Sequence, residues 1–456
     1  MYRKIRFLFH LGIAFISKYR RLLISGFLVG TLSFILIPRI VSLLPPLRET
    51  QIVAQIGTFS LTNLPMSIQK KISVGLTSIS PSGLPNPGLS DSWYATDSGK
   101  TYVFSITDNN FWQDGTPVTS EDISYNFKDT VIEYPDKNHV KISLPDPFSP
   151  LPVSVSRPIF KSTVKKNIFN NVSPLLGIGT YKLENIRKNG QIVESLTLNP
   201  VQRDNRLPKL HYIFYPNQQA AQTAFKLGIV NSIESISETG DLKTWPNVNI
   251  TESVQKDRFV AVLFNTQSPV FSGSSGKNLR LALAYSIEKT RWVNRAIGPI
   301  PPESWAFNPD TKTFDQDIER AKTLLEKVEK IPETLTLIAL PSYLETAEEI
   351  KTDWENIGIK TNIQIQQEIP SEFDVLLIAQ IIPLDPDQYS LWHSTQDQIN
   401  LTRLKNPRID KLLEDGRKSL DLDERRKIYF DFQKYLVEEV PAVFLYYPMT
   451  YTIDRK

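Results

Sequence analysis

Residues 108–128 read DNNFWQDGTPVTSEDISYNFK, a stretch in which four carboxylates lie within fifteen positions. These carboxylates are Asp108, Asp114, Glu121 and Asp122. A calcium-binding loop needs oxygen ligands at positions 1, 3 and 5, glycine at position 6 and glutamate at position 12. Counted from Asp108, position 5 is Trp112 and position 6 is Gln113, so the spacing excludes a calcium loop.

Local backbone roles account for most of these acids. Asp114 lies in QDGTP, a sequence typical of a turn. Thr119 and Asp122 have the spacing of a capping box, which predicts a helix that begins here and buries Ile123 and Phe127. Acidic residues are favourable in the first helical turn because the helix dipole is positive there.

Strands and helices are expected to alternate along the rest of the chain. Hydrophobic periodicity predicts strands at 101–106, 333–340, 361–366 and 442–447, and an apolar strand within 257–271 that leads into a polar loop. It predicts helices at 278–297, 314–328, 345–360 and, as a pair, within 406–441. This alternation indicates an α/β fold. At 456 residues the chain is long enough for two or three lobes.

Composition excludes several classes of site. With no cysteine, the chain has no disulfide, thiolate metal site, cysteine nucleophile or lipid-modified cysteine. None of its four histidines are close enough for a helical zinc pair, so no metal or cofactor is expected. Residues 1–48 hold eight of the 52 basic residues and no acid, which leaves 44 basic against 49 acidic residues. The remainder lacks the basic field that nucleic acid requires.

The N-terminal segment predicts a membrane anchor. Residues 22–37 carry no charge, and the apolar run extends to Leu44 past Arg39. Twenty-three helical residues rise about 34 Å, enough for a hydrocarbon core of about 30 Å. Six basic residues precede Leu22 and place the N-terminus in the cytoplasm and the body outside. A cleaved signal peptide is the alternative, although no small-residue cleavage site follows.

One enzyme class shares short motifs with this chain. SIEK (286–289) and SYN (124–126) match two of the three motifs of penicillin-recognising serine enzymes. Their order is reversed here, and no K-[ST]-G follows. This class is retained only as a remote alternative.

The chain resembles the extracellular solute-binding proteins of bacterial ABC importers, in the peptide/nickel class (family five). The resemblance covers nearly all of residues 52–456 and rests on motifs in family order. They include GTFSLTNLP (57–65), the segment around WQDGTP (112–117), GIGTYKL (177–183), FNTQSPVF (264–271), LRLALAYSIEKTRWV (279–293), IKTDWENIGIKTNIQI (350–365), FDVLLIAQIIPLDPDQYSLWHS (373–394) and VPAVFLYY (440–447). Within them Trp112, Asp114, Gly115 and Asp122 form the fold signature.

The resemblance implies a two-lobe periplasmic-binding-protein-like clamshell with an extra domain, preceded by an N-terminal transmembrane helix. It assigns residues 1–47 to a basic cytoplasmic segment and a span at about 22–44, residues 48–67, 165–263 and 440–456 to lobe I, residues 68–164 to a second domain of that lobe, and residues 264–439 to lobe II. Crossovers between the lobes are expected near 264–266 and 438–444.

The implied function is that of a receptor, not an enzyme. Such proteins close over a solute by hinge motion and deliver it to permease subunits, so a monomer that binds an oligopeptide or similar extended polar solute is expected. The expected binding residues are Phe264, Asn265, Trp305, Gln380, Asp385 and Trp392. Peptide-binding members pair the ligand amine with an acid that falls here on Ile382, so Asp385 or Asp387 is a possible substitute. An anchored sensor or scaffold without an importer is the alternative function.

Overall fold

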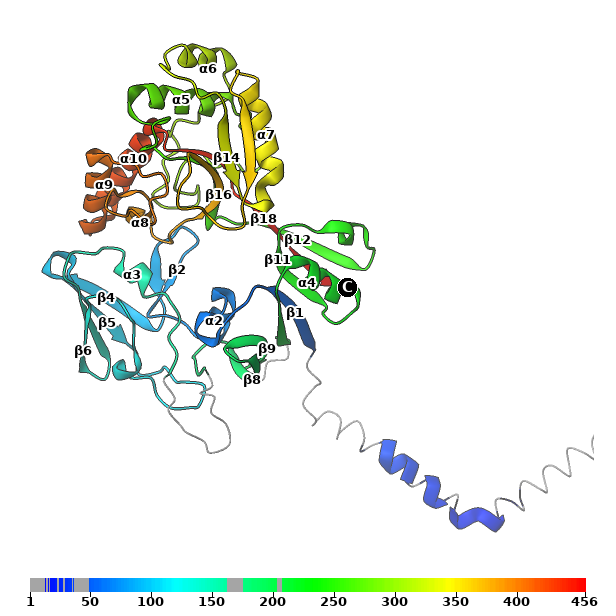
Figure 1. The fold of residues 1–456 in the computed structure, drawn as a ribbon. Helices are drawn as coiled ribbons and strands as arrows, with labels where there is room; N and C mark the ends of the chain where they lie inside the picture. The colour runs from blue at the N-terminus through cyan, green and yellow to red at the C-terminus, as the bar shows by residue number, and fades with distance from the viewer. Residues whose placement is uncertain are drawn as a thin grey trace, which may run out of the picture. The chain divides into compact units, whose positions relative to one another are not determined.

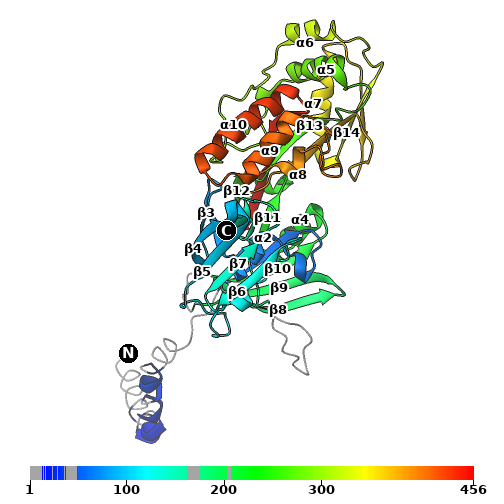
Figure 2. The same cartoon turned by 90° about the vertical axis from the view of Figure 1, so that its left-hand side faces the viewer.

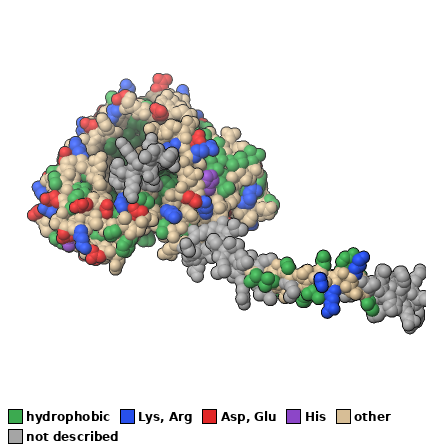
Figure 3. Space-filling view, turned by 90° about the horizontal axis from the view of Figure 1, so that it is seen from below, with side chains coloured by type: hydrophobic (Ala, Val, Ile, Leu, Met, Phe, Trp, Pro, Cys, Tyr) green, Lys and Arg blue, Asp and Glu red, His purple; other side chains and the backbone are tan. Residues whose placement is uncertain are grey.

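The computed structural model describes residues 49–161, 175–202 and 207–456, together with residues 13, 15, 17–22, 24–27, 29–34 and 36. It divides into two units, residues 1–50 with 203–209 and residues 51–202 with 210–456. The described residues between 13 and 36 are helical, and apolar side chains such as Leu22, Phe27 and Phe34 are exposed on them. Figure 3 shows hydrophobic and basic side chains together on the surface of this segment. Among these residues the structure has no helix of the length and apolarity that a membrane crossing requires. Part of the predicted span, residues 37–44, lies outside the described residues.

A seven-stranded sheet gathers strands from both ends of the second unit (Figure 1). Its order is β12 (Val248–Val254), β18 (Met449–Arg455), β11 (Ser232–Ile236), β1 (Thr50–Ile56), β10 (Lys209–Tyr215), β9 (Ile192–Pro200) and β8 (Tyr181–Asn189). Helices α2 (Met66–Ile72) and α4 (Gln218–Lys226) bury Ile68 and Phe225 in its two apolar clusters. Gly228, at φ +76°, ends the α4 segment before β11.

A four-stranded antiparallel sheet follows, in the order β4 (Ser90–Thr96), β5 (Thr101–Ile106), β7 (His139–Ser143) and β6 (Val131–Asp136). The predicted strand at 101–106 is confirmed, and it buries alternate residues Tyr102, Phe104 and Ile106. A small hairpin, β2 (Thr77–Ile79) and β3 (Pro85–Pro87), and the short helix α3 (Leu151–Ser154) accompany this sheet.

The WQDGTP segment (112–117) contributes a core residue, Trp112, and a tight turn at Gly115 beside this sheet. Trp112 is buried, and its indole N–H donates to the Asp122 carboxylate at 3.2 Å. Gly115 has a φ of +83°, which only glycine adopts without strain, while the Asp114 carboxylate accepts from the Thr116 N–H at 3.0 Å. The predicted capping box between Thr119 and Asp122 is present.

The helix predicted after Thr119 is wrong in extent. The capping box starts only a 3-10 turn, Ser120–Asp122; Ile123 is extended, and residues 123–127 form no helix. Ile123 is buried in the sheet's core, and the Tyr125 hydroxyl accepts from the Leu76 N–H and donates to Val155 O, so both residues are held by contacts with distant segments. Tertiary contacts therefore override the local helix signal.

A five-stranded sheet, with the helices that pack on it, forms a further part of the structure, which we call the second lobe. Its order is β15 (Thr361–Ile365), β14 (Leu335–Ala339), β16 (Val375–Ile381), β13 (Arg258–Phe264) and β17 (Ala442–Tyr446). In Figure 1, α7 (Leu344–Glu355) lies to one side of β14 and β16, and α9 (Pro407–Lys418) and α10 (Leu422–Glu439) lie to the other. Figure 2 shows α9 and α10 side by side. The remaining helices of this lobe are α5 (Gly273–Ser286), α6 (Ile318–Leu325) and α8 (Tyr389–Trp392).

The helix predicted at 278–297 also ends early. The α5 helix stops at Ser286, where Ile287 becomes extended and buried. The Glu288 N–H then donates to the Asp353 carboxylate on α7 at 3.0 Å instead of continuing the helix. A hydrogen bond to α7 thus ends the helix, although the helical sequence pattern continues to residue 297.

The chain crosses between the seven-stranded and five-stranded sheets at residues 255–257 and 447–448. The two crossings are joined by the Gln255 N–H, which donates to Pro448 O at 2.8 Å. The resemblance implied crossovers near 264–266 and 438–444, but β13 and β17 belong to the five-stranded sheet. Phe259–Phe264 is a continuous buried run, which is typical of a strand covered on both faces. The lobe boundaries themselves stay a prediction.

Candidate ligand-binding cleft

Residues 382–388 follow β16 and meet three neighbouring cavities, which together we call the cleft. Cavity A has a volume of about 210 Å³, cavity B about 540 Å³ and cavity C about 490 Å³. Leu384 lines cavities A and C, and Asp385 lines cavities B and C. Concave sites between domains are the usual place for a small ligand.

Cavity A is lined mainly by apolar groups. The β2–β3 hairpin contributes Ile79, and the second lobe contributes Ile300, Ile382 and Leu384. Its charged rim consists of Lys256, Asp257 and Glu303, and the Lys256 ammonium group lies 2.5 Å from the Glu303 carboxylate. Lys256 belongs to one of the crossings between the sheets, and its ammonium group lies 5.2 Å from the ring centroid of Tyr447 on the other. A ligand in cavity A would therefore contact the crossings directly.

Cavity B has an aromatic side and a charged side. Trp93 and Tyr102 come from β4 and β5, while Trp305 and Arg425 come from the second lobe. The Arg425 guanidinium carbon lies 5.2 Å from the Trp305 ring centroid, a cation–π contact. Burial raises the pKa of Tyr102 to about 12, so its hydroxyl stays protonated and donates to Phe148 O at 3.1 Å.

Asp385 is buried at the centre of the cleft. The Arg425 guanidinium donates to its carboxylate at 2.7 Å and also donates to Gly416 O at 2.9 Å. Burial raises the pKa of the Asp385 carboxyl, and the Arg425 guanidinium opposes this rise. A buried carboxylate is stable in its charged form only with such a partner.

Asp387 has a second arginine partner. Arg417 Nε and a terminal guanidinium nitrogen donate to the same carboxylate oxygen at 3.0 and 2.9 Å. The guanidinium also stacks over Tyr389, with its carbon 4.0 Å from the ring centroid, and lies 5.2 Å from that of Phe148. Both aspartates of the PLDPDQ loop are therefore held by arginines from α9 and α10.

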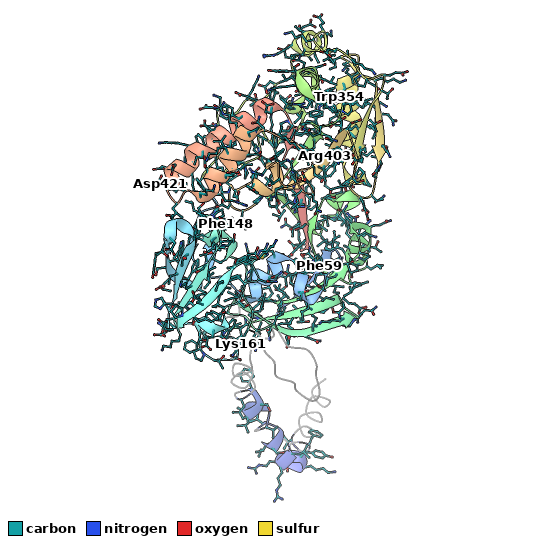
Figure 4. The ribbon with its side chains drawn as sticks, turned by 60° about the vertical axis from the view of Figure 1, so that its left-hand side comes forward. Phe59, Phe148, Lys161, Trp354, Arg403 and Asp421 are labelled. Carbon is teal, nitrogen blue, oxygen red and sulfur yellow. The ribbon has the colours of Figure 1, made fainter. Side chains whose placement is uncertain are left out.

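The two sides of the cleft touch each other directly. The Trp305 N–H donates to Ser82 O at 3.0 Å, and the Ser149 N–H donates to Arg417 O at 2.8 Å. Figure 4 shows Phe148, next to Ser149, on the segment that faces the end of α9 and the start of α10, near Asp421. These contacts hold the lobes together beside the cavities.

The structure brings two of the six expected binding residues together. Trp305 and Asp385 both line cavity B. Four others, Phe264, Asn265, Gln380 and Trp392, are not among the lining residues of the three cavities. Phe264 is buried in the core, the Asn265 amide donates to Phe373 O at 3.0 Å, and the Trp392 indole donates to the Gln388 side chain at 2.8 Å.

Sequence reasoning did not identify the two arginines of the cleft or two of the aromatic residues that line cavity B. Trp93 and Tyr102 were not among the expected binding residues, yet both line cavity B. The alternating apolar residues of β4 and β5 could have indicated that Trp93 and Tyr102 lie in one sheet. Arg425 and Arg417 had no local signal, because their partners lie 40 and 30 residues away.

The S-x-x-K match has a structural role. Ser286 is fully buried, and its hydroxyl donates to Leu283 O at 3.0 Å. The buried Lys289 ammonium group donates to the backbone oxygens of Ala284, Ile287 and Phe314. Burial lowers the pKa of the Lys289 ammonium group to about 7. Neither side chain is open to a substrate in this structure.

Comparison with known proteins agrees with this architecture. The chain is 23% identical over 410 residues to the probable D,D-dipeptide-binding periplasmic protein DdpA of Escherichia coli, covering 78% of each chain. It is 22% identical to the dipeptide-binding protein DppE of Bacillus subtilis, covering 82% of this chain and 81% of that one.

Solved structures share the periplasmic-binding-protein fold. NikZ from Campylobacter jejuni, solved in complex with Ni(L-His), is 22% identical with a TM-score of 0.71, covering 90% of this chain and 94% of its own. The CtaP substrate-binding protein of Listeria monocytogenes is 22% identical with a TM-score of 0.73 and the same coverage. The model of bacterial extracellular solute-binding proteins, family 5 Middle, matches residues 85–400. The chain therefore belongs to the family 5 bacterial extracellular solute-binding proteins.

Proposed function

We propose that this protein is the membrane-anchored, extracellular substrate-binding subunit of an ABC importer. It captures an oligopeptide or a similar extended polar solute by closing its lobes and delivers it to permease subunits. The observation that carries this proposal is the cleft, where three cavities meet at residues 382–388 and are lined by segments around the four-stranded sheet and by segments of the second lobe. The peptide-binding names of relatives such as DppE support the solute class.

The arrangement of the crossings supports closure by a hinge. Two short segments, 255–257 and 447–448, carry the chain between the sheets, and they lie beside cavity A through Lys256. Few residues then need to change their backbone angles when the lobes move. A solute that contacts both lobes favours the closed state by its greater affinity for that state.

The N-terminal segment supports the anchor. Its described helical residues expose large apolar side chains, and the sequence before Leu22 carries six basic residues and no acid. Such a segment suits insertion with the N-terminus in the cytoplasm. The body, a monomer in this proposal, is then held at the outer face of the membrane.

Mass spectrometry of the full-length chain tests the proposal. The chain is expressed in a peptide-rich bacterial host, purified gently in detergent and measured natively, then again after denaturation. We expect a mass increase from bound solute in the native spectrum and short peptides or one defined solute after release. A chain that carries nothing, and whose thermal stability no solute in a broad panel raises, would contradict solute capture and favour a sensor or scaffold.

A further inference from the structure

Four carboxylates line the three cavities, and each already has a cationic partner. Asp385 is paired with Arg425 at 2.7 Å and Asp387 with Arg417 at 2.9 Å. Asp257 and Glu303 complete the acidic lining of the cleft.

The two remaining acids lie on the rim of cavity A. Glu303 lies 2.5 Å from the Lys256 ammonium group, and Asp257 lies 3.1 Å from the guanidinium of its neighbour Arg258. A ligand ammonium group would have to share one of the four carboxylates with the cation that is already bound to it. The positive charge of that cation lowers the gain from binding a second one.

The loop itself offers an apolar surface at the centre of the cleft. Ile382 is 7% exposed, lines cavities A and C and donates its N–H to Asp257 O at 2.7 Å. Leu384 lines the same two cavities and is 56% exposed. An unpaired ammonium group against this surface would lose hydration without compensation, whereas a neutral apolar group would gain from burial.

The charge left over in the cleft is positive. Arg157 lines cavity C, and its exposed guanidinium has no carboxylate partner among the residues that the structure describes. When each carboxylate is counted with its cationic partner, Arg157 leaves one positive charge in excess, which favours a carboxylate over an ammonium group.

We infer that the solute captured here presents an uncharged, apolar end to the cleft and no free ammonium group, as an N-acylated peptide does. This inference rests on the proposed function and names its substrate class. The carboxylate that such a peptide carries at its other end is compatible with Arg157.

A competition between matched peptide pools tests this inference on the full-length chain. Lysine side chains of a carrier protein are blocked before digestion, so that each new peptide has one free amine, at its N-terminus. Half of the digest is N-acetylated, the two halves are mixed in equal amounts, and peptides retained by the tagged protein are released and identified. We expect acetylated peptides to be enriched at least tenfold over their free-amine counterparts.

Variants of the loop place a carboxylate where the structure has none. Ile382→Asp is expected to shift the retained pool toward free-amine peptides. Because Ile382 is nearly buried, Leu384→Asp provides a second test at an exposed position, and Leu384→Asn is its uncharged control. Only the aspartate variants should shift the ratio, and circular dichroism and thermal melts confirm that each variant is folded.

Each outcome has a separate meaning. Equal retention of both pools, or preference for free amines, by the natural chain would overturn the inference and leave peptide capture intact. Retention of neither pool by the natural chain and the folded Leu384→Asp variant would overturn peptide capture itself. Enrichment of acetylated peptides, reversed by Leu384→Asp and unchanged by Leu384→Asn, supports both.

Discussion

Two acidic segments of this protein, residues 108–128 and residues 382–388, contain carboxylates with different kinds of partner. In the first segment, the Asp122 carboxylate accepts from the Thr119 N–H and from the Trp112 indole, both within ten residues. In the second, Asp385 and Asp387 take arginines from 40 and 30 residues away.

The difference follows from burial. Carboxylates near the surface keep part of their hydration, so neutral donors from the backbone and from hydroxyl groups are sufficient partners. Asp385 is buried against Arg425 and Tyr429, where only a full positive charge offsets the lost hydration. The buried Asp385 therefore has a distant cation as its partner, while Asp122 is held by local donors.

Removing the distant cation should have the largest effect. Arg425→Ala leaves Asp385 buried without its partner, and we expect the free energy of unfolding to fall by about 3–5 kcal/mol at pH 7. Urea denaturation of the full-length chain measures the loss. Lys411→Ala, which removes an exposed pair with Asp415, is the control and should leave the free energy of unfolding nearly unchanged.

The same variant has a predicted pH dependence. Loss of Arg425 removes the group that opposes the raised pKa of Asp385. A carboxyl whose folded pKa is raised is penalised above its unfolded pKa and not below it. The deficit of Arg425→Ala should thus shrink as pH falls from 7 toward 4. A deficit that is small at pH 7, or constant with pH, would refute the buried ion pair.

Removing a local partner should have a moderate effect. Asp122→Ala loses the acceptor of the Trp112 indole N–H and of the Thr119 N–H, and we expect a loss of about 1–2 kcal/mol. Asp122→Asn keeps a carbonyl acceptor and should retain most of the stability. Glu121→Ala, at an exposed position, should change stability by less than about 0.5 kcal/mol. If Asn is as harmful as Ala, the negative charge matters more than the hydrogen bonds.

The smallest predicted effect on stability concerns Asp114 and should appear only at acidic pH. Hydrogen bonds from the Thr116 hydroxyl and N–H, with Lys161 nearby, lower the pKa of Asp114 to about 2. A lowered pKa stabilises the fold above pH 4, and this contribution disappears as pH falls toward 2. Between pH 4 and pH 2 the melting temperature of the natural chain should therefore fall more steeply than that of Asp114→Asn. Parallel melting curves would show that Asp114 contributes nothing through its charge.

Much of the fold could be predicted from local pattern. The strand at 101–106 and the helices within 314–328 and 345–360 form where period-two and period-3.6 patterns placed them. The helices predicted after Thr119 and through 278–297 end early, because Ile123 and Ile287 are drawn into cores built by distant segments. Local propensity could not anticipate those contacts.

The candidate site was less accessible to sequence reasoning. Trp305 and Asp385 line cavity B, whereas Phe264 and Trp392 lie in the core, since a buried aromatic and a ligand-stacking aromatic have the same sequence pattern. The site residues stay a prediction until a bound solute is seen.

The sequence by itself determined the local chemistry of this protein: the turn at Gly115, the capping box at Thr119, the apolar strands and the motif order of the family. Only the tertiary structure decided which charges of the cleft are free. Asp385 and Asp387 lie in PLDPDQ, a sequence that by itself predicts exposed turn residues. Folding nevertheless brings Arg425 and Arg417 against them. The physical reason is that desolvation depends on everything packed around a group, and that packing comes from segments far away in the chain.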